Sequence, residues 1–322
     1  MMEIKTVSLF GGEITLYGIL MILACLLAGA GLILLSGRKG IKRPSAAVYC
    51  LLAAALGLLL GRLIYCAVRF DRVFYDAMGD FMGFLPFFDV RVGSLNIGGV
   101  MLGCILAAPL AARIGKGKAA GYLDCAVFPG LSLFIAERLA EPLVGKGYGV
   151  YLYDASFAFY PLAMQTYMDE YALSVCFIEA VLAAALIFAL TALAKKRLQT
   201  GQLFLCALTL FCACQIMPES LRHDDVLFIF IFARVTQICY ALMLAGAQIA
   251  ALARARRNGL GFRQAVTEFL LLLAGAGICI GAEFALDKTN LSHTLIYTVM
   301  IAVLAGMAAL VLRRILRKEA AQ

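Results

Sequence analysis

Residues 14–68 read ITLYGILMILACLLAGAGLILLSGRKGIKRPSAAVYCLLAAALGLLLGRLIYCAV, and these residues indicate the fold class. It consists of two apolar runs, each of about 20 residues, joined by the basic segment SGRKGIKR. A helix of this length spans the hydrocarbon core of a bilayer, which is roughly 30 Å thick. Similar runs recur along the whole chain, and hydrophobic residues make up 63% of the 322 residues. The sequence therefore predicts an all-α integral membrane protein, a polytopic bundle of about nine transmembrane helices. The predicted spans are approximately 14–35, 46–68, 92–112, 120–145, 173–194, 202–218, 228–253, 266–286 and 294–312.

Lys and Arg gather in the segments after the first, third, fifth, seventh and ninth predicted spans. Because basic loops are retained in the cytoplasm, we expect the N-terminus outside and the C-terminus inside. The net charge of +8 is spread over these short segments, so we expect no nucleic acid partner. The chain has eleven cysteines, all within apolar runs, and only two histidines, so we expect no disulfides, no metal site and no other cofactor.

Polar side chains concentrate in the outer halves of the predicted spans, whereas the inner halves carry almost no charge apart from Asp124. A charged side chain in hydrocarbon costs about 2.5–3.5 kcal/mol, so such residues mark a polar site inside a helix bundle. A one-sided set of Arg and Glu suits a phospholipid headgroup, because Arg donates to phosphate and carboxylates orient it or transfer protons. The structural alternative is that pairs such as Arg138–Glu141 and Arg62–Glu179 hold helices together. The set comprises Tyr17, Arg62, Asn96, Glu137, Arg138, Glu141, Glu179, Gln215, Glu219, Arg234, Gln237 and Glu283.

Two long outer loops, residues 69–90 and 146–172, are rich in Phe, Tyr, Met and Asp. Aromatic side chains are enriched at the headgroup level of membranes. These loops therefore either roof the polar site or anchor the bundle at the interface.

Several short motifs follow one another along the first seven spans. They are Tyr17-Gly18, Leu60-Gly61-Arg62-Leu63-Ile64-Tyr65, Gly98-Gly99 with Gly103, Leu123-Asp124, Glu137-Arg138-Leu139, Glu179, and Glu219 with Arg222 and Asp225. Their order and spacing resemble the prolipoprotein diacylglyceryl transferase family over roughly residues 14–253. The resemblance implies a seven-span core, residues 1–257, followed by a two-span extension, residues 258–322, that has no counterpart in the basic family plan.

Members of this family are bacterial inner-membrane enzymes that move a diacylglyceryl group from phosphatidylglycerol to the lipobox cysteine of a preprolipoprotein. The resemblance thus implies two partners, a phosphatidylglycerol-like phospholipid and preprolipoprotein signal peptides, and thioether formation at the outer face of the membrane. In this frame Arg138 holds the lipid phosphate and Glu141 is a second catalytic residue. The implied substrate-binding residues are Tyr17 and Arg62 in the headgroup pocket, Glu179 and Glu219 as partners of the arginines, Arg222 near the entrance, and Asn96, Gly98, Gly99 and Gln215.

The chain departs from the family pattern where the family carries a His before its paired glycines, because this position is Ile97. The family's G-R-x-G-N signature reads Glu137-Arg138-Leu139-Ala140-Glu141 here. A base is needed to form a thiolate, and His223 is either a relocated catalytic base or a solvated loop residue.

Three functions stay open: a divergent transferase, a catalytically silent relative that binds lipid or scaffolds partners, and a small transporter. The charges do not continue to the inner face, which argues against a transport path.

Overall fold

The computed structural model describes residues 6–9, 12–76, 78–89, 94–166, 170–196, 198–224, 226–229, 233–257, 259–289 and 291–316. Within these ranges nine helices are long and apolar enough to cross a membrane, which confirms the predicted polytopic helical fold. They are α1 Leu16–Ser36, α2 Arg43–Val68, α4 Ile97–Gly115, α5 Ala119–Ala140, α6 Val175–Ala194, α7 Gln202–Leu221, α8 Val235–Arg257, α9 Phe262–Lys288 and α10 His293–Leu316. The shorter helices are η1 Gly37–Lys39, α3 Phe70–Phe74, η2 Leu85–Phe87, η3 Glu141–Val144 and η4 Ala155–Phe157.

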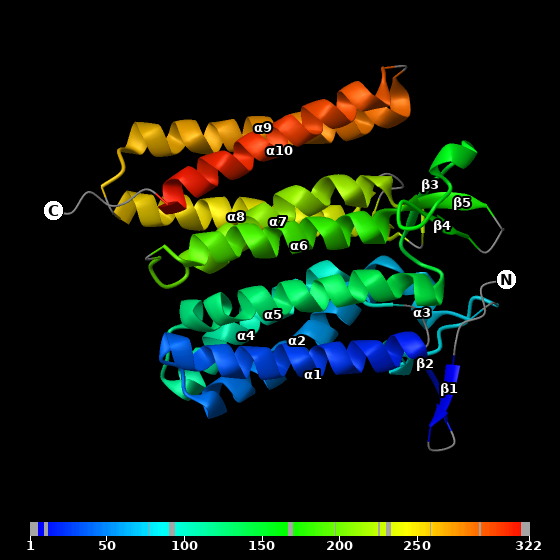
Figure 1. Ribbon diagram of the computed structural model, residues 1–322, viewed down its shortest axis with the longest axis horizontal. Coiled ribbons are helices and arrows are strands. Elements are labelled where there is room, and N and C mark those ends of the chain that lie inside the picture. The colour runs from blue at the N-terminus through cyan, green and yellow to red at the C-terminus, as the bar shows by residue number, and fades with distance from the viewer. Residues whose placement is uncertain are drawn as a thin grey trace.

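The long helices lie side by side and alternate in direction along the chain (Figure 1). Three small antiparallel sheets lie at one end of the bundle, which we call the strand end. Their strands are β1 Thr6–Leu9 with β2 Gly12–Thr15, β3 Tyr148–Tyr151, β4 Ala163–Gln165 and β5 Tyr171–Ser174 in the order β3-β5-β4, and β6 Phe228–Ile229 with β7 Ala233–Arg234.

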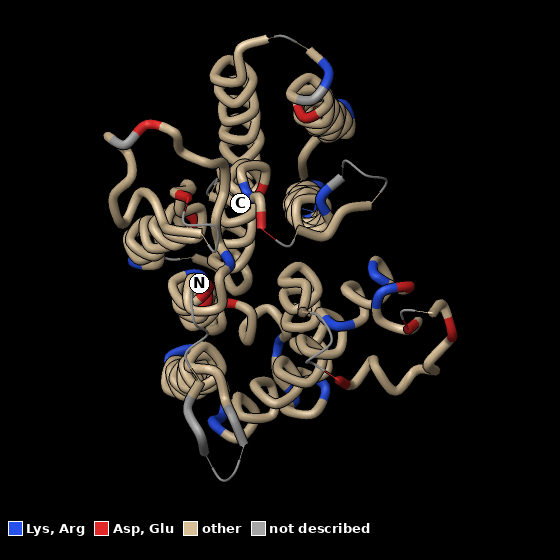
Figure 2. The backbone as a smooth tube through the Cα atoms, turned by 90° about the vertical axis from the view of Figure 1, so that its right-hand side faces the viewer, with Lys and Arg blue, Asp and Glu red and all other residues tan. Residues whose placement is uncertain are grey.

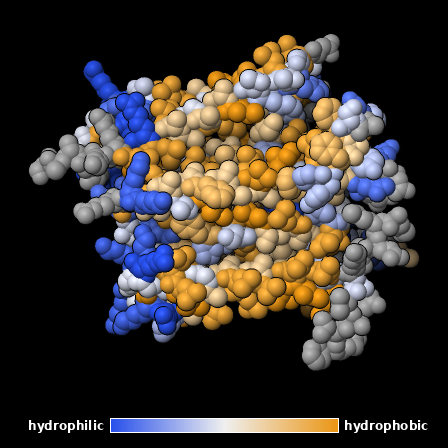
Figure 3. All heavy atoms as spheres, viewed as in Figure 1, coloured by the Kyte–Doolittle hydropathy of each residue, from blue (hydrophilic) through white to orange (hydrophobic). Residues whose placement is uncertain are grey.

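Basic side chains gather at the opposite end, which we call the basic end. Arg38 and Lys39 follow α1 there, and α4, α8 and α10 each have Arg in their last turn. Figure 3 shows the strongly hydrophilic residues of this end beside an apolar belt that covers the length of the helices. The belt is the surface expected for contact with lipid.

Glycines allow α2 and α4 to pack closely. A Cβ atom on Gly99 would lie 2.5 Å from the Leu60 carbonyl oxygen, and one on Gly103 would lie 2.5 Å from the Gly57 amide nitrogen. Small residues let helix backbones approach in this way in membrane proteins. The glycines of the predicted motif therefore fix the contact between these two helices.

Two predicted spans begin later than hydropathy suggests. The third begins at Ile97, because the Asn96 side chain caps the helix by accepting a hydrogen bond from the Gly99 amide at 3.2 Å. The seventh begins at Val235, because the preceding residues include the β6–β7 hairpin. Arg234, expected within this span, therefore lies in a strand.

Asp124 fixes the basic end of the bundle. Its carboxylate accepts hydrogen bonds from the Gly201 amide at 2.8 Å and the Phe204 amide at 2.9 Å, and it lies 3.6 Å from Lys39. It thus caps the first turn of α7, where backbone amides lack helical partners. The charge of Asp124, which lies apart from the other charges of the predicted spans, is therefore structural.

The last two helices pack onto the remainder of the bundle. α10 contacts α7 and α8, whereas α9 contacts α10 and α8. Leu304, Ala308 and Val311 of α10 belong to the same buried apolar cluster as side chains of α5 to α8. The extension is therefore continuous with the hydrophobic core of the preceding helices.

Candidate functional site

A buried network of arginines and carboxylates lies at the strand end. It forms there because α5 and α7 end, and α6 begins, at this end of the antiparallel bundle. Figure 2 views the molecule from this end. The Glu179 carboxylate is 0% exposed and the Arg138 side chain 4%, so these charges are shielded from solvent. We call this network the Arg–Glu cluster; its members are Glu137, Arg138, Glu141, Glu179, Arg222 and Asp224.

Arg222 is the most heavily bonded member of the cluster. Its Nε and Nη2 donate to the two carboxylate oxygens of Asp224, at 3.1 and 2.6 Å. Nη2 also donates to Glu141 Oε1 at 2.8 Å, and Nη1 donates to Glu179 Oε2 at 3.0 Å. All three nitrogens of this guanidinium are thus bonded to carboxylates, which gives Arg222 the geometry of a structural connector.

Electrostatics hold the Arg222–Asp224 pair charged. Burial lowers the pKa of Arg222, but the carboxylates of Glu141, Glu179 and Asp224 outweigh this effect and raise it well above its usual value. Burial raises the pKa of Asp224, but the charge and hydrogen bonds of Arg222, together with the Gly147 amide, lower it below its usual value.

Arg138 is bonded less completely. Its Nη1 donates to Glu141 Oε1 at 2.7 Å and lies 3.3 Å from Glu179 Oε2. Its Nε lies 3.0 Å from Glu137 Oε2, but neither atom forms an aligned hydrogen bond with any described residue. Nη2 likewise donates to none of the described residues. Because a guanidinium has five donors, Arg138 retains donors for an anionic group.

Backbone of the long loop after η3 lies against the cluster. The Gly147 amide donates to Asp224 Oδ2 at 2.7 Å, and Gly149 forms a β-bridge with Arg222. Gly147 has φ +88°, and a Cβ atom there would lie 2.6 Å from the Cβ of Cys176. Glycine is therefore required, since both the left-handed backbone and the close contact exclude a side chain. Gly147 and Gly149 of this loop therefore contact the cluster directly and cover part of it.

A row of aromatic rings begins at Arg138. Its guanidinium lies 4.9 Å from the centre of the Phe134 ring, which packs edge-on against Phe211 at 4.8 Å. Phe211 in turn packs edge-on against Tyr240 at 5.7 Å. The charged network therefore rests on an apolar aromatic layer, where electrostatic interactions are stronger than in water.

Besides Arg138 Nε and Glu137 Oε2, four further buried polar atoms in or around the cluster form no hydrogen bond with the residues that the structure describes. Leaving such an atom unsatisfied costs about 1–3 kcal/mol. Their concentration in one place marks the region as a polar site with unused hydrogen-bonding capacity. They are Glu141 Oε2, Glu179 Oε1, Gln215 Oε1 and Tyr240 Oη.

Several predicted site residues meet in this region. Glu179 contacts both arginines as expected, and Gln215 donates to the Glu179 carbonyl at 3.3 Å. Tyr17 lies half-buried in the first turn of α1, which packs against α5 and η3.

Glu219 and His223 lie close in sequence to Arg222. We expect Glu219 to pair with an arginine, and His223 to be either a catalytic base or a solvated loop residue. The buried Glu219 carboxylate forms no ion pair within 4.0 Å of a basic side chain in the described ranges, so it does not orient an arginine directly. The His223 side chain is exposed, and its Nδ1 lies 3.0 Å from the Leu221 carbonyl oxygen. Asp225, the last residue of the motif, lies outside the described residues.

Arg62 does not pair with Glu179, so that predicted ion pair is wrong. The Arg62 guanidinium donates instead to backbone carbonyls at the strand end. A guanidinium has five donors, so it can satisfy several loop carbonyls that form no hydrogen bonds within a helix or a sheet. Its acceptors are the carbonyl oxygens of Pro86 at 2.9 Å, Phe87 at 2.9 Å, Asp89 at 2.8 Å and Ser94 at 3.3 Å.

Asn96, Gly98 and Gly99 have structural surroundings. Besides capping α4, Asn96 donates through Nδ2 to Thr236 Oγ1 at 3.1 Å. A Cβ atom on Gly98 would overlap the side chain of Cys239 on α8, with Sγ at 2.7 Å. These residues fix how α4 packs against α2 and α8, and their predicted role in substrate binding stays a prediction.

Sequence reasoning assigns no role to Asp224 or Tyr240. Asp224 could have been found from spacing, because residues two apart in an extended segment lie on the same side, and Arg222 has an extended backbone. Tyr240 carries no comparable signal, since one Tyr in an apolar span is ordinarily a packing residue.

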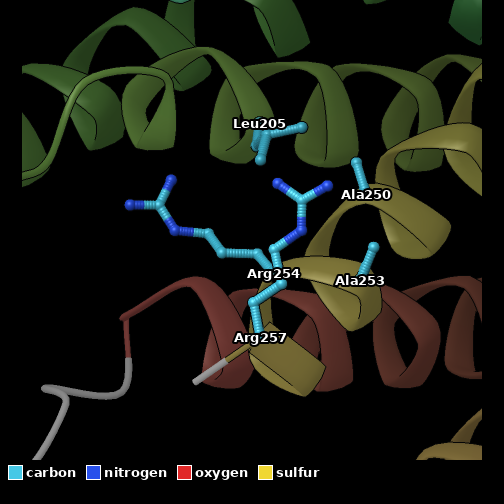
Figure 4. A pocket seen from close by; sticks show the side chains of 5 residues that line it. All are labelled: Leu205, Ala250, Ala253, Arg254 and Arg257. Atoms are coloured by element: carbon cyan, nitrogen blue, oxygen red, sulfur yellow. The ribbon is translucent and has the colours of Figure 1, made fainter.

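A separate cavity of about 440 Å³ opens at the basic end, where the side chains of Arg254 and Arg257 lie beside Leu205, Ala250 and Ala253 (Figure 4). Arg254 is bonded to Gln199. Among the described residues, the cavity lining includes no carboxylate, thiol or hydroxyl group that could act as a base or a nucleophile. The Arg–Glu cluster is the stronger candidate for a chemical site.

These features define a multi-pass integral membrane protein with a buried, charged polar site at one end of its helix bundle. The chain matches the family model described as Prolipoprotein diacylglyceryl transferase over residues 5–254, and it belongs to that family. The predicted resemblance is therefore confirmed. A comparison with curated proteins gave no match. Membership associates the chain with diacylglyceryl transfer in lipoprotein biosynthesis and with a lipid partner in the membrane.

Proposed function

We propose that this protein is a divergent transferase that moves a diacylglyceryl group from a phosphatidylglycerol-like phospholipid to a cysteine thiol of a preprolipoprotein signal peptide. The thiolate sulfur would attack the glycerol carbon that carries the phosphate ester. A C–S bond forms, the C–O bond to phosphate breaks, and glycerol phosphate leaves with the electron pair. The thiol proton passes to a base.

The unused donors of Arg138 carry this proposal. A phosphate offers oxygens to which a guanidinium donates in a bidentate manner. Arg138 Nη2 donates to none of the described residues, and Nε forms only a misaligned ion pair with Glu137 at 3.0 Å, whereas Nη1 is held by Glu141. Glu141 and Glu179 would orient the guanidinium, and Arg222 would hold both carboxylates in place. Arg138 is therefore the arginine suited to the lipid phosphate.

Two groups are candidates for the base. Glu219 is buried and has no cationic partner within 4.0 Å among the described residues, so its carboxylate is not neutralised by an arginine. His223 carries an imidazole that can accept a proton, but its side chain is exposed beside the cluster. We propose that Glu219 is the base that accepts the thiol proton. His223 is the alternative base that the experiment compares with it.

The proposal also implies an orientation of the protein in the membrane and a location of the site. If the basic end faces the cytoplasm, as Lys and Arg in short loops favour, then the strand end faces outward. The site would then meet the outer leaflet of a bacterial cell membrane, where a preprolipoprotein is exposed after translocation. Residues 1–257 would form the transferase core, and residues 258–322 would extend it.

A catalytically silent relative that binds lipid is the second candidate, and one observation favours it. Ile97, at the position of the family's His, packs against the buried apolar cluster and cannot accept a proton. Such a protein would retain the lipid site through Arg138 and lose the transfer step.

The test is transfer of a labelled diacylglyceryl group from phosphatidylglycerol to a lipobox peptide by the purified protein in detergent. Arg138→Gln should abolish transfer and weaken lipid binding, whereas Arg254→Gln at the basic end is the matched control and should retain both. Glu219→Gln should abolish transfer with lipid binding retained, and His223→Ala should retain transfer. A folded wild-type protein that binds lipid but transfers nothing would establish the silent relative, and one that also fails to bind lipid would refute both proposals.

A further inference from the structure

Glu283 lies on α9, beyond residues 5–254 that match the family model, yet it contacts helices that build the site. Its carboxylate accepts hydrogen bonds from the Ser220 hydroxyl at 3.1 and 3.2 Å. It also accepts a hydrogen bond from Gln237 Nε2 at 2.9 Å. Ser220 belongs to the last turn of α7 and Gln237 to the first turn of α8. One carboxylate of the extension thus joins three helices at the strand end.

Two side chains that follow α7 in sequence donate to backbone carbonyls at its end. Gln237 Nε2 donates to the Ile216 carbonyl at 3.3 Å, and Arg234 Nη1 donates to the carbonyls of Glu219 and Arg222, the latter at 2.8 Å. Two side chains from the β7–α8 segment therefore hold the end of α7.

The same turn leads directly into the cluster. Glu219 precedes Ser220, and Arg222 follows it by two residues. Because Arg222 bonds Glu141, Glu179 and Asp224, its position fixes three carboxylates. A shift of the α7 terminus would move the arginine and release these carboxylates together.

We propose that Glu283 is a positioning residue of the site. Through this residue, the α9–α10 pair contributes to the geometry of the Arg–Glu cluster. The carboxylate holds Ser220 and Gln237, these hold the end of α7, and the end of α7 places Glu219 and Arg222. The proposal rests on the proposed function for its catalytic consequence, but its structural core does not depend on transfer activity.

A different carboxylate in the same helix supplies the matched control. Glu268 pairs with Arg314 between α9 and α10, at the basic end. Glu268→Ala and Glu283→Ala both remove one carboxylate from α9, but only Glu283 contacts Ser220. If hydrogen exchange or kinetics differ between the two variants, the cause is the contact of Glu283 with α7 and α8 and not a general destabilisation of the α9–α10 pair.

The experiment uses the full-length protein in detergent with phosphatidylglycerol as the probe. Hydrogen exchange is measured on the peptide that covers residues 216–222, and transfer kinetics are measured on Glu283→Ala, Glu283→Gln and Glu268→Ala. Glu283→Ala should speed exchange in this peptide and lower kcat/KM by roughly ten- to a hundredfold, as displaced catalytic groups do. Glu283→Gln keeps an oxygen that accepts from Ser220 and should recover most of both losses.

Equal exchange of residues 216–222 in Glu283→Ala and Glu268→Ala would overturn the inference, whatever the activity. Faster exchange with kcat/KM unchanged would also overturn it, because the turn would then not position the site. If the wild type transfers nothing, the proposed function fails while the exchange measurement still decides whether Glu283 holds α7. A Ser220→Ala, Glu283→Ala double variant should lose no more than Glu283→Ala alone, since contacting groups are not additive.

Discussion

The two carboxylates next to Arg138 provide a sharp test of the cluster geometry, because they should contribute unequally to stability. Glu141 Oε1 accepts hydrogen bonds from Arg138 at 2.7 Å and from Arg222 at 2.8 Å. Glu137 approaches Arg138 Nε to 3.0 Å without hydrogen-bond alignment, and its side chain is 20% exposed. We therefore compare Glu141→Gln with Glu137→Gln, two substitutions of the same size and chemistry.

The magnitude follows from the bonds that each variant changes. Gln at position 141 keeps an oxygen acceptor, so both hydrogen bonds persist but lose their charge assistance. A hydrogen bond to a charged group contributes about 1.5–3 kcal/mol and a neutral one about 0.5–1.5 kcal/mol, so each bond should weaken by about 1 kcal/mol. The new amide nitrogen replaces Glu141 Oε2, which forms no hydrogen bond with described residues. The expected loss is about 2 kcal/mol for Glu141→Gln and below about 1 kcal/mol for Glu137→Gln.

The assay is reversible unfolding in mixed detergent micelles with increasing dodecyl sulfate, followed by circular dichroism. Glu141→Ala, which removes both bonds and leaves two arginines short of a partner, should lose about 3–5 kcal/mol, as broken buried ion pairs do. The structure requires that the loss of stability be largest for Glu141→Ala, smaller for Glu141→Gln and smallest for Glu137→Gln. Equal losses at positions 137 and 141, or a larger loss at 137, would show that Glu141 does not bridge the arginines.

Three further predictions address other parts of the molecule. Gly103→Ala places a Cβ atom 2.5 Å from the backbone of α2 and should cost about 1–3 kcal/mol more than Gly130→Ala, whose Cβ would meet no atom within 4 Å; equal unfolding midpoints would contradict this. Asp224 has a lowered pKa in the folded protein, so its contribution to stability is complete above its ordinary value near 3.9 and is lost as pH falls through the lower folded value. Unfolding curves measured between about pH 5 and 3 should therefore show a loss that Asp224→Asn lacks, and identical slopes would refute the Arg222 pairing. Asp124→Asn leaves one of two α7 amides without an acceptor and should lower stability by about 1–2 kcal/mol in a thermal melt, with no loss expected if the cap is incidental.

The membrane fold was accessible from sequence because hydropathy depends on length and composition alone. Nine apolar runs predict nine helices, and the alternation of basic segments predicts their alternating directions. The errors fall where local bonds override hydropathy. Asn96 caps α4 and so delays its start, and the β6–β7 hairpin takes up residues that the seventh predicted span includes.

The candidate site was accessible only in part, because counting along a helix gives the depth of a residue but not the direction in which it faces. Depth correctly brings Arg138, Glu141 and Glu179 to one level, and all three are bonded there. The same count places Arg62 at a similar level, yet this residue faces loop carbonyls instead of Glu179. Rotation about the helix axis is set by tertiary packing, which no single span specifies.

The number of carboxylates in the cluster connects its stability to its proposed chemistry. Four carboxylates contact the two buried arginines, namely Glu137, Glu141, Glu179 and Asp224. A phosphate bound to Arg138 would compete with these groups for the same positive charge. In surroundings of low dielectric the competition is relieved only if a carboxylate moves away or takes up a proton. A carboxylate that takes up a proton in response can take it from the acceptor thiol, directly or through Glu219, and this would form the thiolate in a chain that carries Ile97 at the position of the family's His.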